Sequence, residues 1–376
     1  MDVSVIVPLY NGKKYIKHII WMIEQNCEKL KSGGNEKQIE IIFVNDNPKE
    51  VITEKDIYKS KKVNNTVLLT NEHNCGIHKT RINGLQCAKG EYILFLDQDD
   101  EITNSYFFTQ FQHIWDADAV LCNGIYRNNK RIYKDELHQR EAITKDKYLS
   151  QETVIISPGQ VLMRKDKIPQ EWKMISLRKN GSDDVFMWVL MLVEQKTFMI
   201  NPECEYYHNE DGSNTSLNFV AMKESVEELL AVIKENDILE KYDLKIFTTS
   251  ILKRIEKYSQ YIYLLNNWEK IVFNIKSYIE NAKCKTVAIY GYGVIGRKIY
   301  GDMKDEGMEV DCFIDRDAEA YAETEIKVYS LKDVKQVIDL LIITPLFDID
   351  RIKEKLSEQK SIGKQMSLKD FLEHNY

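Results

Sequence analysis

A strand that ends in a cluster of carboxylates places the tightest limit on how this chain folds. Residues 92–96 read Tyr-Ile-Leu-Phe-Leu and run directly into Asp97, Asp99 and Asp100. In extended geometry, residues two apart point to the same side, so Asp97 and Asp99 share a face. Paired oxygen ligands of this kind suit Mg²⁺ or Mn²⁺. The other interpretation is an acidic turn that caps the next helix, and the run alone leaves both open.

The composition is that of an ordinary globular protein. The 376 residues are 43% hydrophobic and 30% charged, with a net charge of −7, and a chain of this length is expected to form two or three domains. The acidic balance gives no support for a nucleic-acid partner. Seven cysteines without paired spacing indicate reduced thiols and a cytoplasmic location. We expect no signal peptide, and no apolar run approaches the roughly 20 residues that span a bilayer.

Three regions differ in their hydrophobic pattern. In residues 1–216 short apolar strands alternate with amphipathic stretches, which predicts an α/β domain with a mostly parallel sheet. Residues 217–283 have the 3.6-residue period of helices and read as a helical connector. A second, smaller α/β pattern of the Rossmann-like kind occupies residues 284–376.

Polar side chains follow several strands of the first region. Asn11 follows the strand Val3–Val7, Asp46 follows the strand Ile39–Val44, and Arg81 lies shortly before the acid-tipped strand. In an open α/β sheet, ligands collect outside the carboxyl ends of the strands. We therefore expect Asp46, Arg81, Asp97 and Asp99 to converge at one edge of the sheet.

The order of these motifs resembles the family 2 glycosyltransferases of the GT-A fold. The motifs are Pro8-x-Tyr10-Asn11, Val44-x-Asp46, Arg81-x-x-Gly84 and the run from Ala88 to Asp100. The resemblance covers roughly the first 215 residues. It implies a metal-dependent enzyme of the hexosyltransferase type, which moves a sugar from a nucleoside-diphosphate donor with inversion. Mn²⁺ or Mg²⁺ is the implied cofactor.

The resemblance also implies roles for individual residues on the donor side. Pro8, Tyr10 and Asn11 match the loop that borders the nucleotide. Asp46 matches the acid that bonds the base, commonly uracil, and Arg81 matches an arginine near the nucleotide or diphosphate.

The two acids of the strand complete the implied donor site. Asp97 would face the ribose or the metal, and Asp99 the metal. Two departures from the family pattern stand nearby. Asn45 occupies the place of a more usual aspartate, and the asparagine that normally follows the arginine is displaced to Asn83.

A second acidic pair, Asp183-Asp184, precedes the apolar run Val185–Val193. Inverting transfer needs a base that takes the proton of the acceptor hydroxyl. The family pair is usually Glu-Asp with the second acid as base, so the resemblance assigns that role to Asp184, with Asp183 beside it. The other interpretation is capping of the helix that follows.

Three further features carry two interpretations each. His208, before Gly212-Ser213, is either a structural histidine or a contact to the metal or diphosphate. The segment Ser157–Gln160 resembles the acceptor side of the family or is only a turn. Trp172 and Trp188 either stack on a sugar or belong to the core, and the core is favoured.

The third region contains Gly291-x-Gly293-x-x-Gly296 after a strand, with Asp315 at the end of the next strand. This is the context of a dinucleotide fingerprint, and it predicts a Rossmann-like fold. Whether the loop binds a nucleotide sugar, a dinucleotide or nothing stays open.

The function predicted from the sequence is sugar transfer from a donor, commonly a UDP-sugar, to a glycan or lipid-linked acceptor in surface polysaccharide synthesis. Peripheral contact with the inner face of a membrane is compatible with it. Two alternatives are an NAD(P)-dependent sugar-nucleotide-modifying enzyme centred on Gly291–Gly296, and a non-catalytic nucleotide-binding protein.

Overall fold

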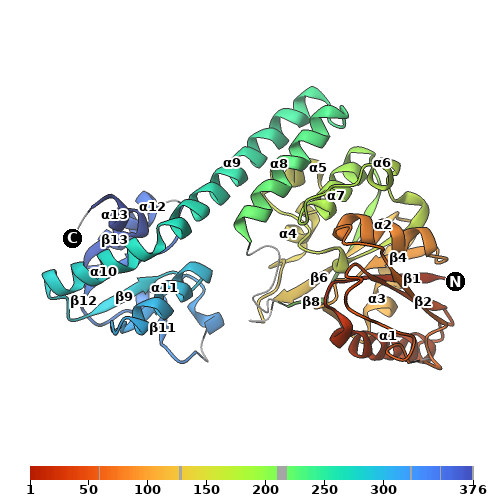
Figure 1. Ribbon diagram of the computed structural model, residues 1–376, viewed down its shortest axis with the longest axis horizontal. Helices are drawn as coiled ribbons and strands as arrows, with labels where there is room; N and C mark the ends of the chain where they lie inside the picture. The colour runs from red at the N-terminus through yellow and green to blue at the C-terminus, as the bar shows by residue number, and fades with distance from the viewer. Residues whose placement is uncertain (59, 127–128, 210–217, 322–323, 348, 375–376) are drawn as a thin grey trace. The chain divides into compact units, whose positions relative to one another are not determined.

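The structure, a computed structural model, describes residues 1–376 except 59, 127–128, 210–217, 322–323, 348 and 375–376. It divides into two compact units, Met1–Ile255 and Glu256–Tyr376 (Figure 1). The division falls inside one helix, α9 (Lys241–Asn266). The three-part division at residues 216 and 283 therefore stays a prediction.

The first unit is built on a sheet of eight strands in the order β3-β2-β1-β4-β7-β6-β8-β5. The strands are β1 (Val3–Leu9), β2 (Ile39–Asn45), β3 (Asn65–Thr70), β4 (Tyr92–Phe95), β5 (Glu101–Ile102), β6 (Ala119–Tyr126), β7 (Val161–Arg164) and β8 (Phe198–His208). Strands β1 to β4 are parallel, whereas β7 is antiparallel to both of its neighbours and β5 to β8. Strands β6 and β8 run in the same direction as β1 to β4, so only β7 and β5 are reversed and the sheet is mostly parallel, as predicted.

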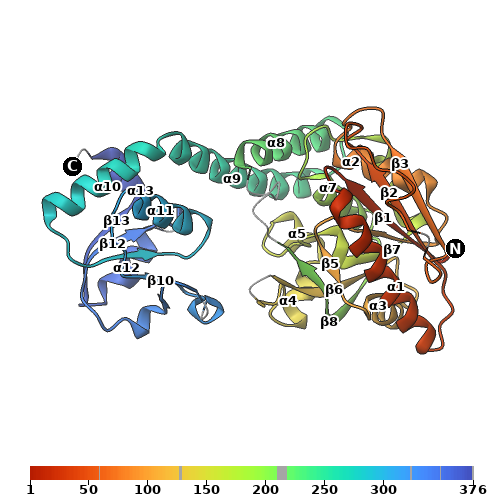
Figure 2. The same ribbon diagram turned by 60° about the horizontal axis from the view of Figure 1, so that its bottom comes forward.

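Helices cover both faces of this sheet (Figures 1 and 2). On one face, α1 (Ile16–Ser32) and α3 (Tyr106–Ile114) bury apolar side chains against Val3, Val5 and Val7. On the other face, Gly84 of α2 (Ile77–Cys87) lies so close to Ile6 that a Cβ would stand 2.4 Å from a methyl carbon. The remaining helices of this unit are α4 (Glu136–Glu141), α5 (Lys145–Leu149), α6 (Gln170–Met174), α7 (Asp183–Val193) and α8 (Phe219–Glu235).

The second unit has a five-stranded sheet, all parallel, in the order β11-β10-β9-β12-β13. Its elements are α10 (Trp268–Ala282), β9 (Val287–Tyr290), α11 (Val294–Asp305), β10 (Cys312–Ile314), β11 (Val328–Tyr329), β12 (Ile338–Ile343), α12 (Ile349–Ser357), β13 (Ile362–Ser367) and α13 (Leu368–Glu373). One apolar cluster joins α10, α11 and α13 to the sheet, and another joins α12 to its other side. This arrangement is Rossmann-like, as predicted.

Both predicted core tryptophans, Trp172 and Trp188, are fully buried in the first unit. The core interpretation is therefore confirmed for them. Within the described part of the chain, we find no helix both long and apolar enough to cross a membrane.

Candidate active site

The loop after β1 is held by the middle residue of the acid-tipped run. The side-chain amide of Gln98 accepts a hydrogen bond from the Tyr10 N–H at 2.9 Å and donates one to the Tyr10 carbonyl at 3.1 Å. Asn11 has a positive φ of 52°, and its side-chain oxygen accepts from Asn47 at 2.7 Å. The Tyr10 side chain remains 51% exposed. This arrangement leaves the exposed ring of Tyr10 at the sheet edge, where a nucleotide is predicted.

Sequence reasoning missed Gln98. It lies between Asp97 and Asp99 in a turn that follows β4 and is closed by a hydrogen bond from the Asp100 N–H to the Asp97 carbonyl at 3.2 Å. The sequence offered no signal for this contact, because the expected extended geometry ends at Phe95.

Asp46 is buried, and its carboxylate orders the segment before α2. Its Oδ1 accepts from the Asn71 side chain and the Cys75 N–H, both at 2.8 Å, and its Oδ2 accepts from the Gly76 N–H at 3.0 Å. A carboxylate offers about four lone-pair sites, so three bonds do not exhaust it. The predicted contact of Asp46 with a base stays a prediction.

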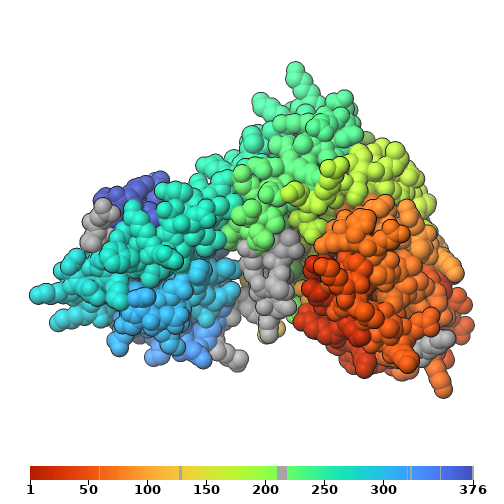
Figure 3. Space-filling view, viewed as in Figure 1, coloured from red at the N-terminus to blue at the C-terminus, as the bar shows by residue number. Residues whose placement is uncertain are grey.

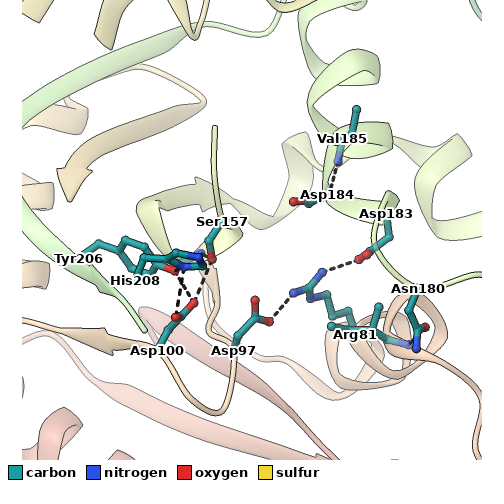
Figure 4. Close-up of polar contacts among 12 residues, drawn as sticks. Arg81, Asp97, Asp100, Ser157, Asn180, Asp183, Asp184, Val185, Tyr206 and His208 are labelled. Atoms are coloured by element: carbon teal, nitrogen blue, oxygen red, sulfur yellow. Dashed lines mark hydrogen bonds and ion pairs between the residues drawn. The ribbon is translucent and has the colours of Figure 1, made fainter. Parts of the chain in front are cut away.

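Arg81 joins two of the predicted acids (Figure 4). It lies on α2 and is 2% exposed, and one terminal nitrogen donates to Asp183 at 2.5 Å while the other donates to Asp97. Asp97 follows β4 and Asp183 begins α7, so three segments distant in sequence meet at one guanidinium. The two carboxylates raise the pKa of Arg81 against the opposing effect of burial. In the structure Arg81 contacts two acids. The predicted contact between Arg81 and the nucleotide or diphosphate stays a prediction.

Asp184 lies beside this group, and its carboxylate has a different environment from that of Asp183. One oxygen accepts from the Val185 N–H at 2.7 Å. In Figure 4 the carboxylates of Asp97 and Asp184 point into the same space. Burial first, and the neighbouring Asp183 second, raise the pKa of Asp184 to about 7. Burial also raises the pKa of Asp97. The N-cap residue Ser182 makes no side-chain capping bond, but the Asp184 bond to Val185 satisfies an amide in the first turn of α7, so the capping interpretation is met in part.

A second polar group lies across that space, around the buried carboxylate of Asp100 (Figure 4). Tyr206 donates to it through its hydroxyl, Ser157 donates at 3.4 Å, and the Asn209 N–H donates at 3.2 Å. The His208 ring lies 3.1 Å from the Tyr206 hydroxyl and 3.5 Å from Asp100. Asp100 therefore links the acid-tipped loop to the end of β8 and to the Ser157–Gln160 turn. The Gly212-Ser213 pair expected after His208 lies outside the described residues.

The carboxylates that could contribute to a divalent cation site are Asp97, Asp183 and Asp184. Asp97 and Asp183 pair with one guanidinium, Asp184 lies beside them, and burial is the first cause of the raised pKa values of Asp97 and Asp184. Within the described residues, no three His, Cys, Asp or Glu side chains are grouped so as to hold an ion by themselves. Mg²⁺ and Mn²⁺ at nucleotide sites commonly need only one or two carboxylates, with phosphates and water completing the shell. The set Asp97, Asp99 and His208 stays a prediction.

The start of α7 is also held from the side of α8, a contact that the sequence did not predict. Glu228 accepts from the backbone N–H groups of Arg178 and Lys179 at 2.8–3.1 Å, and the hydroxyls of Ser225 and Ser182 are 2.8 Å apart. Figure 3 shows the surface of α8 beside that of the 170–190 segment. Gly181, with a φ of +117°, makes the sharp turn between these contacts.

The glycine loop of the second unit has the backbone conformation that the Gly-x-Gly-x-x-Gly fingerprint predicts. Gly291 has a φ of +98°, and a Cβ on Gly296 would stand 1.9 Å from the Gly291 carbonyl. Both oxygens of Asp315 are engaged by the protein, one by the Tyr292 N–H at 2.7 Å and the other by the Asp317 N–H at 2.8 Å. The Tyr292 ring packs on Phe313 with centroids 4.7 Å apart. Asp315 thus has the same kind of backbone partners as Asp46, and a nucleotide at this loop stays a prediction.

Comparison with known proteins agrees with the fold and the motifs. Residues 4–172 match the model of glycosyl transferase family 2. Over these residues the chain is similar to glycosyltransferase family 2.

Curated relatives bear names of the same class. A poly(ribitol-phosphate) beta-glucosyltransferase of Bacillus spizizenii is 23% identical over 68% of this chain and 40% of its own length. The minor teichoic acid biosynthesis protein GgaB of Bacillus subtilis is 25% identical over 65% of this chain and 27% of its own. The glycosyltransferase GlyG of Streptococcus pneumoniae is 31% identical over 34% and 39%. The chain spans less than half the length of each.

Among solved structures, S. aureus TarS 1-349 has a TM-score of 0.46 and 19% identity, covering 70% of this chain and 74% of that one. The mannosyltransferase PcManGT of Pyrobaculum calidifontis, in complex with GDP-Man and Mn²⁺, has a TM-score of 0.46 and 13% identity, with 71% of both chains covered.

Proposed function

We propose that this chain is an inverting, metal-dependent glycosyltransferase that uses a nucleoside-diphosphate sugar, in the first place a UDP-sugar. The observation that carries the proposal is the meeting of Asp97, Arg81 and Asp183 beside Asp184. The match of residues 4–172 to the model of glycosyl transferase family 2 supports it. The acceptor class we propose is a surface glycan or a lipid-linked precursor, since one relative is named for poly(ribitol-phosphate) and another for minor teichoic acid biosynthesis.

The proposed reaction is a single displacement at the anomeric carbon. The acceptor oxygen forms a bond to that carbon as the bond to the diphosphate oxygen breaks, and the nucleoside diphosphate leaves with the electron pair. A divalent cation at Asp97 and Asp99 would neutralise charge on the diphosphate. Asp184 takes the proton of the acceptor hydroxyl.

The environment of Asp184 suits a base. A general base works best when its pKa lies near the operating pH, and the pKa of Asp184 is raised to about 7. Asp183 is less suited, because its carboxylate is 2% exposed and paired with Arg81. We therefore assign proton transfer to Asp184, and the holding of Arg81 to Asp183.

The substitution Asp184→Asn tests the assignment because it keeps the shape and removes the charge. A calorimetric titration with UDP, with and without Mn²⁺, should show affinity within about twofold of the unaltered protein. Release of UDP from a panel of UDP-sugars should fall by about 10²–10⁴-fold, the usual contribution of general base catalysis. Normal turnover by this variant would refute the role of Asp184.

The same titrations separate the alternatives. An enzyme centred on Gly291–Gly296 would bind NAD and would keep its activity in the Asp184→Asn variant. A non-catalytic protein would bind UDP without releasing it from any sugar donor. Binding of UDP that needs Mn²⁺, together with turnover that needs Asp184, is the result that the proposal requires.

A further inference from the structure

His78 is a buried histidine whose two ring nitrogens are both engaged. It lies on α2, one turn before Arg81, and is 1% exposed. Its Nδ1 is 3.0 Å from the backbone nitrogen of Leu177, and its Nε2 is 3.0 Å from the Trp172 carbonyl oxygen. An amide N–H only donates and a carbonyl only accepts. The imidazole is therefore neutral, with its proton on Nε2.

The environment of the ring agrees with a neutral form. Burial lowers the pKa of His78, while Asp183 raises it and Arg81 lowers it. A second proton on Nδ1 would face the Leu177 N–H, so the protonated ring would lose that hydrogen bond. Neutral His78 thus holds the segment that connects α6 to α7, because it donates one hydrogen bond to Trp172 and accepts one from Leu177.

His78 also reaches α7 through Trp172. Its ring packs on the Trp172 indole with centroids 4.5 Å apart, and on Phe186 of α7 at 6.3 Å. The indole Nε1–H of Trp172 donates to the backbone carbonyl of Asp183 at 2.8 Å. Trp172 and Phe186 are fully buried, so this contact path has no room to shift without repacking.

Helix α2 therefore contacts Asp183, the first residue of α7, in two ways, one direct and one through Trp172. Arg81 holds the Asp183 side chain, and His78 holds its backbone through Trp172. Residues three apart on a helix share a face, which is why His78 and Arg81 act on the same neighbour. The next residue along α7 is Asp184.

We propose that His78 is the positioning residue for the base of this enzyme: its neutral imidazole fixes Trp172 and Leu177 so that α7 presents Asp184 at the proposed site of proton transfer. The inference rests on the proposed function for the role of Asp184. Misplacement of a reacting group by about 1 Å can lower a rate by about 10²-fold, so the expected effect falls on turnover and not on donor binding.

The test compares two substitutions at position 78. His78→Phe keeps a ring and removes both hydrogen bonds, and we expect kcat for UDP release to fall about 10- to 100-fold, with the UDP–Mn²⁺ affinity within twofold. His78→Gln keeps a neutral donor and acceptor, and we expect it to recover most of that kcat. Trp172→Phe, which removes the indole N–H together with part of the buried ring, should give an intermediate loss of kcat.

Tyr133→Phe is the matched control. Tyr133 is 1% exposed and donates to the Val154 carbonyl at 3.0 Å, so its loss also removes a buried hydrogen bond from the first unit. We expect a lowered melting temperature with unchanged kcat. If His78→Phe changes kcat no more than this control, or lowers UDP affinity in step with kcat, the positioning role is refuted.

A measurement without turnover separates this inference from the proposed function. In ¹⁵N-histidine spectra of the full chain, His78 should show a protonated Nε2 and an unprotonated Nδ1 that persist from pH 7 to pH 6. A charged ring or the opposite tautomer would refute the contact path. Failure of the unaltered protein to release UDP from any donor would instead refute the proposed function.

Discussion

The carboxylates around Arg81 in the first unit and the carboxylate of Asp315 in the second unit have opposite surroundings. At the edge of the first sheet, Asp97, Asp183 and Asp184 gather at one guanidinium, and two of them have raised pKa values. At the edge of the second, Asp315 is bonded through both oxygens to backbone N–H groups. Functional sites commonly hold groups with perturbed pKa values, and the comparison teaches that a motif match and an electrostatic need for a ligand are separate signals.

The largest expected effect is on the free energy of unfolding, and it comes from comparing one arginine in each unit, Arg81 and Arg297. Arg81→Gln leaves Asp97 and Asp183 without their cation, and breaking a buried pair typically costs about 3–5 kcal/mol. Arg297, over the Tyr292 ring at 5.6 Å, makes an exposed contact that is worth about 0.5–1 kcal/mol.

Urea unfolding followed by fluorescence measures both variants, because Trp172 and Trp188 lie in the first unit and Trp268 in the second. Equal midpoint shifts for Arg81→Gln and Arg297→Gln would break the comparison.

The second prediction is the pH dependence of turnover. Asp184 must be ionised to accept a proton, and its pKa is raised to about 7, so kcat/KM should rise with pH up to about 7 and then level. Below that value the slope should approach tenfold per pH unit, which corresponds to about 1.4 kcal/mol.

A profile of UDP release between pH 5.5 and 8.5 checks this expectation. Asp183→Asn, which removes the nearest charge that raises the pKa of Asp184, should move the midpoint to lower pH. A flat profile in the unaltered protein would show that Asp184 is not the titrating base.

The third prediction concerns stability. Because the pKa of Asp184 is raised in the folded protein, ionising it there is unfavourable, and folding stability falls as the pH rises from the ordinary value near 4 to about 7. Asp184→Asn removes this loss. We expect a gain on the order of 1 kcal/mol at pH 8, discounted for partial exposure, and a much smaller gain at pH 5. Melting temperatures of the two proteins at both pH values decide it, and equal gains would contradict the assigned charge.

The smallest expected effect is at the glycine loop of the second unit. A Cβ on Gly293 would meet nothing within 4 Å, and its φ of −71° suits any residue. Gly293→Ala should therefore leave the melting temperature and the rate of UDP release unchanged within experimental error. If it instead abolished a measured NAD or UDP-sugar affinity, the loop would be a binding site and the contrast between the sheets would disappear.

Local patterns in the sequence predicted most elements of the fold. The strands around Val3–Val7, Ile39–Val44 and Tyr92–Leu96 and the helix after the glycine loop are confirmed within one or two residues. Such elements depend on periodic burial, which a single sequence displays. The direction of β7 and the continuity of α9 were not predictable, because both depend on contacts between distant segments.

The carboxylates of the site were predictable for a different reason. Asp97, Asp183 and Asp184 carry charge in contexts that resemble a known family, so the sequence marks them. Arg81, which pairs with two of them, was also predicted, but the residues that position the neighbouring helix and loop were not. His78 meets Leu177 across 99 positions, and Gln98 meets Tyr10 across 88, and neither side chain differs from an ordinary polar residue until the packing is known.

The contacts of α8 constrain how the proposed enzyme can diversify. The backbone amides just before α7 are held by Glu228, and both that glutamate and Asp184 lie beyond residues 4–172. Exchange between relatives of the helices that follow residue 172 would carry over the proposed donor carboxylates but would replace the contact that supports the proposed proton acceptor. A hybrid of that kind would retain nucleotide recognition and lose turnover unless its new helix again offered a carboxylate to those two amides.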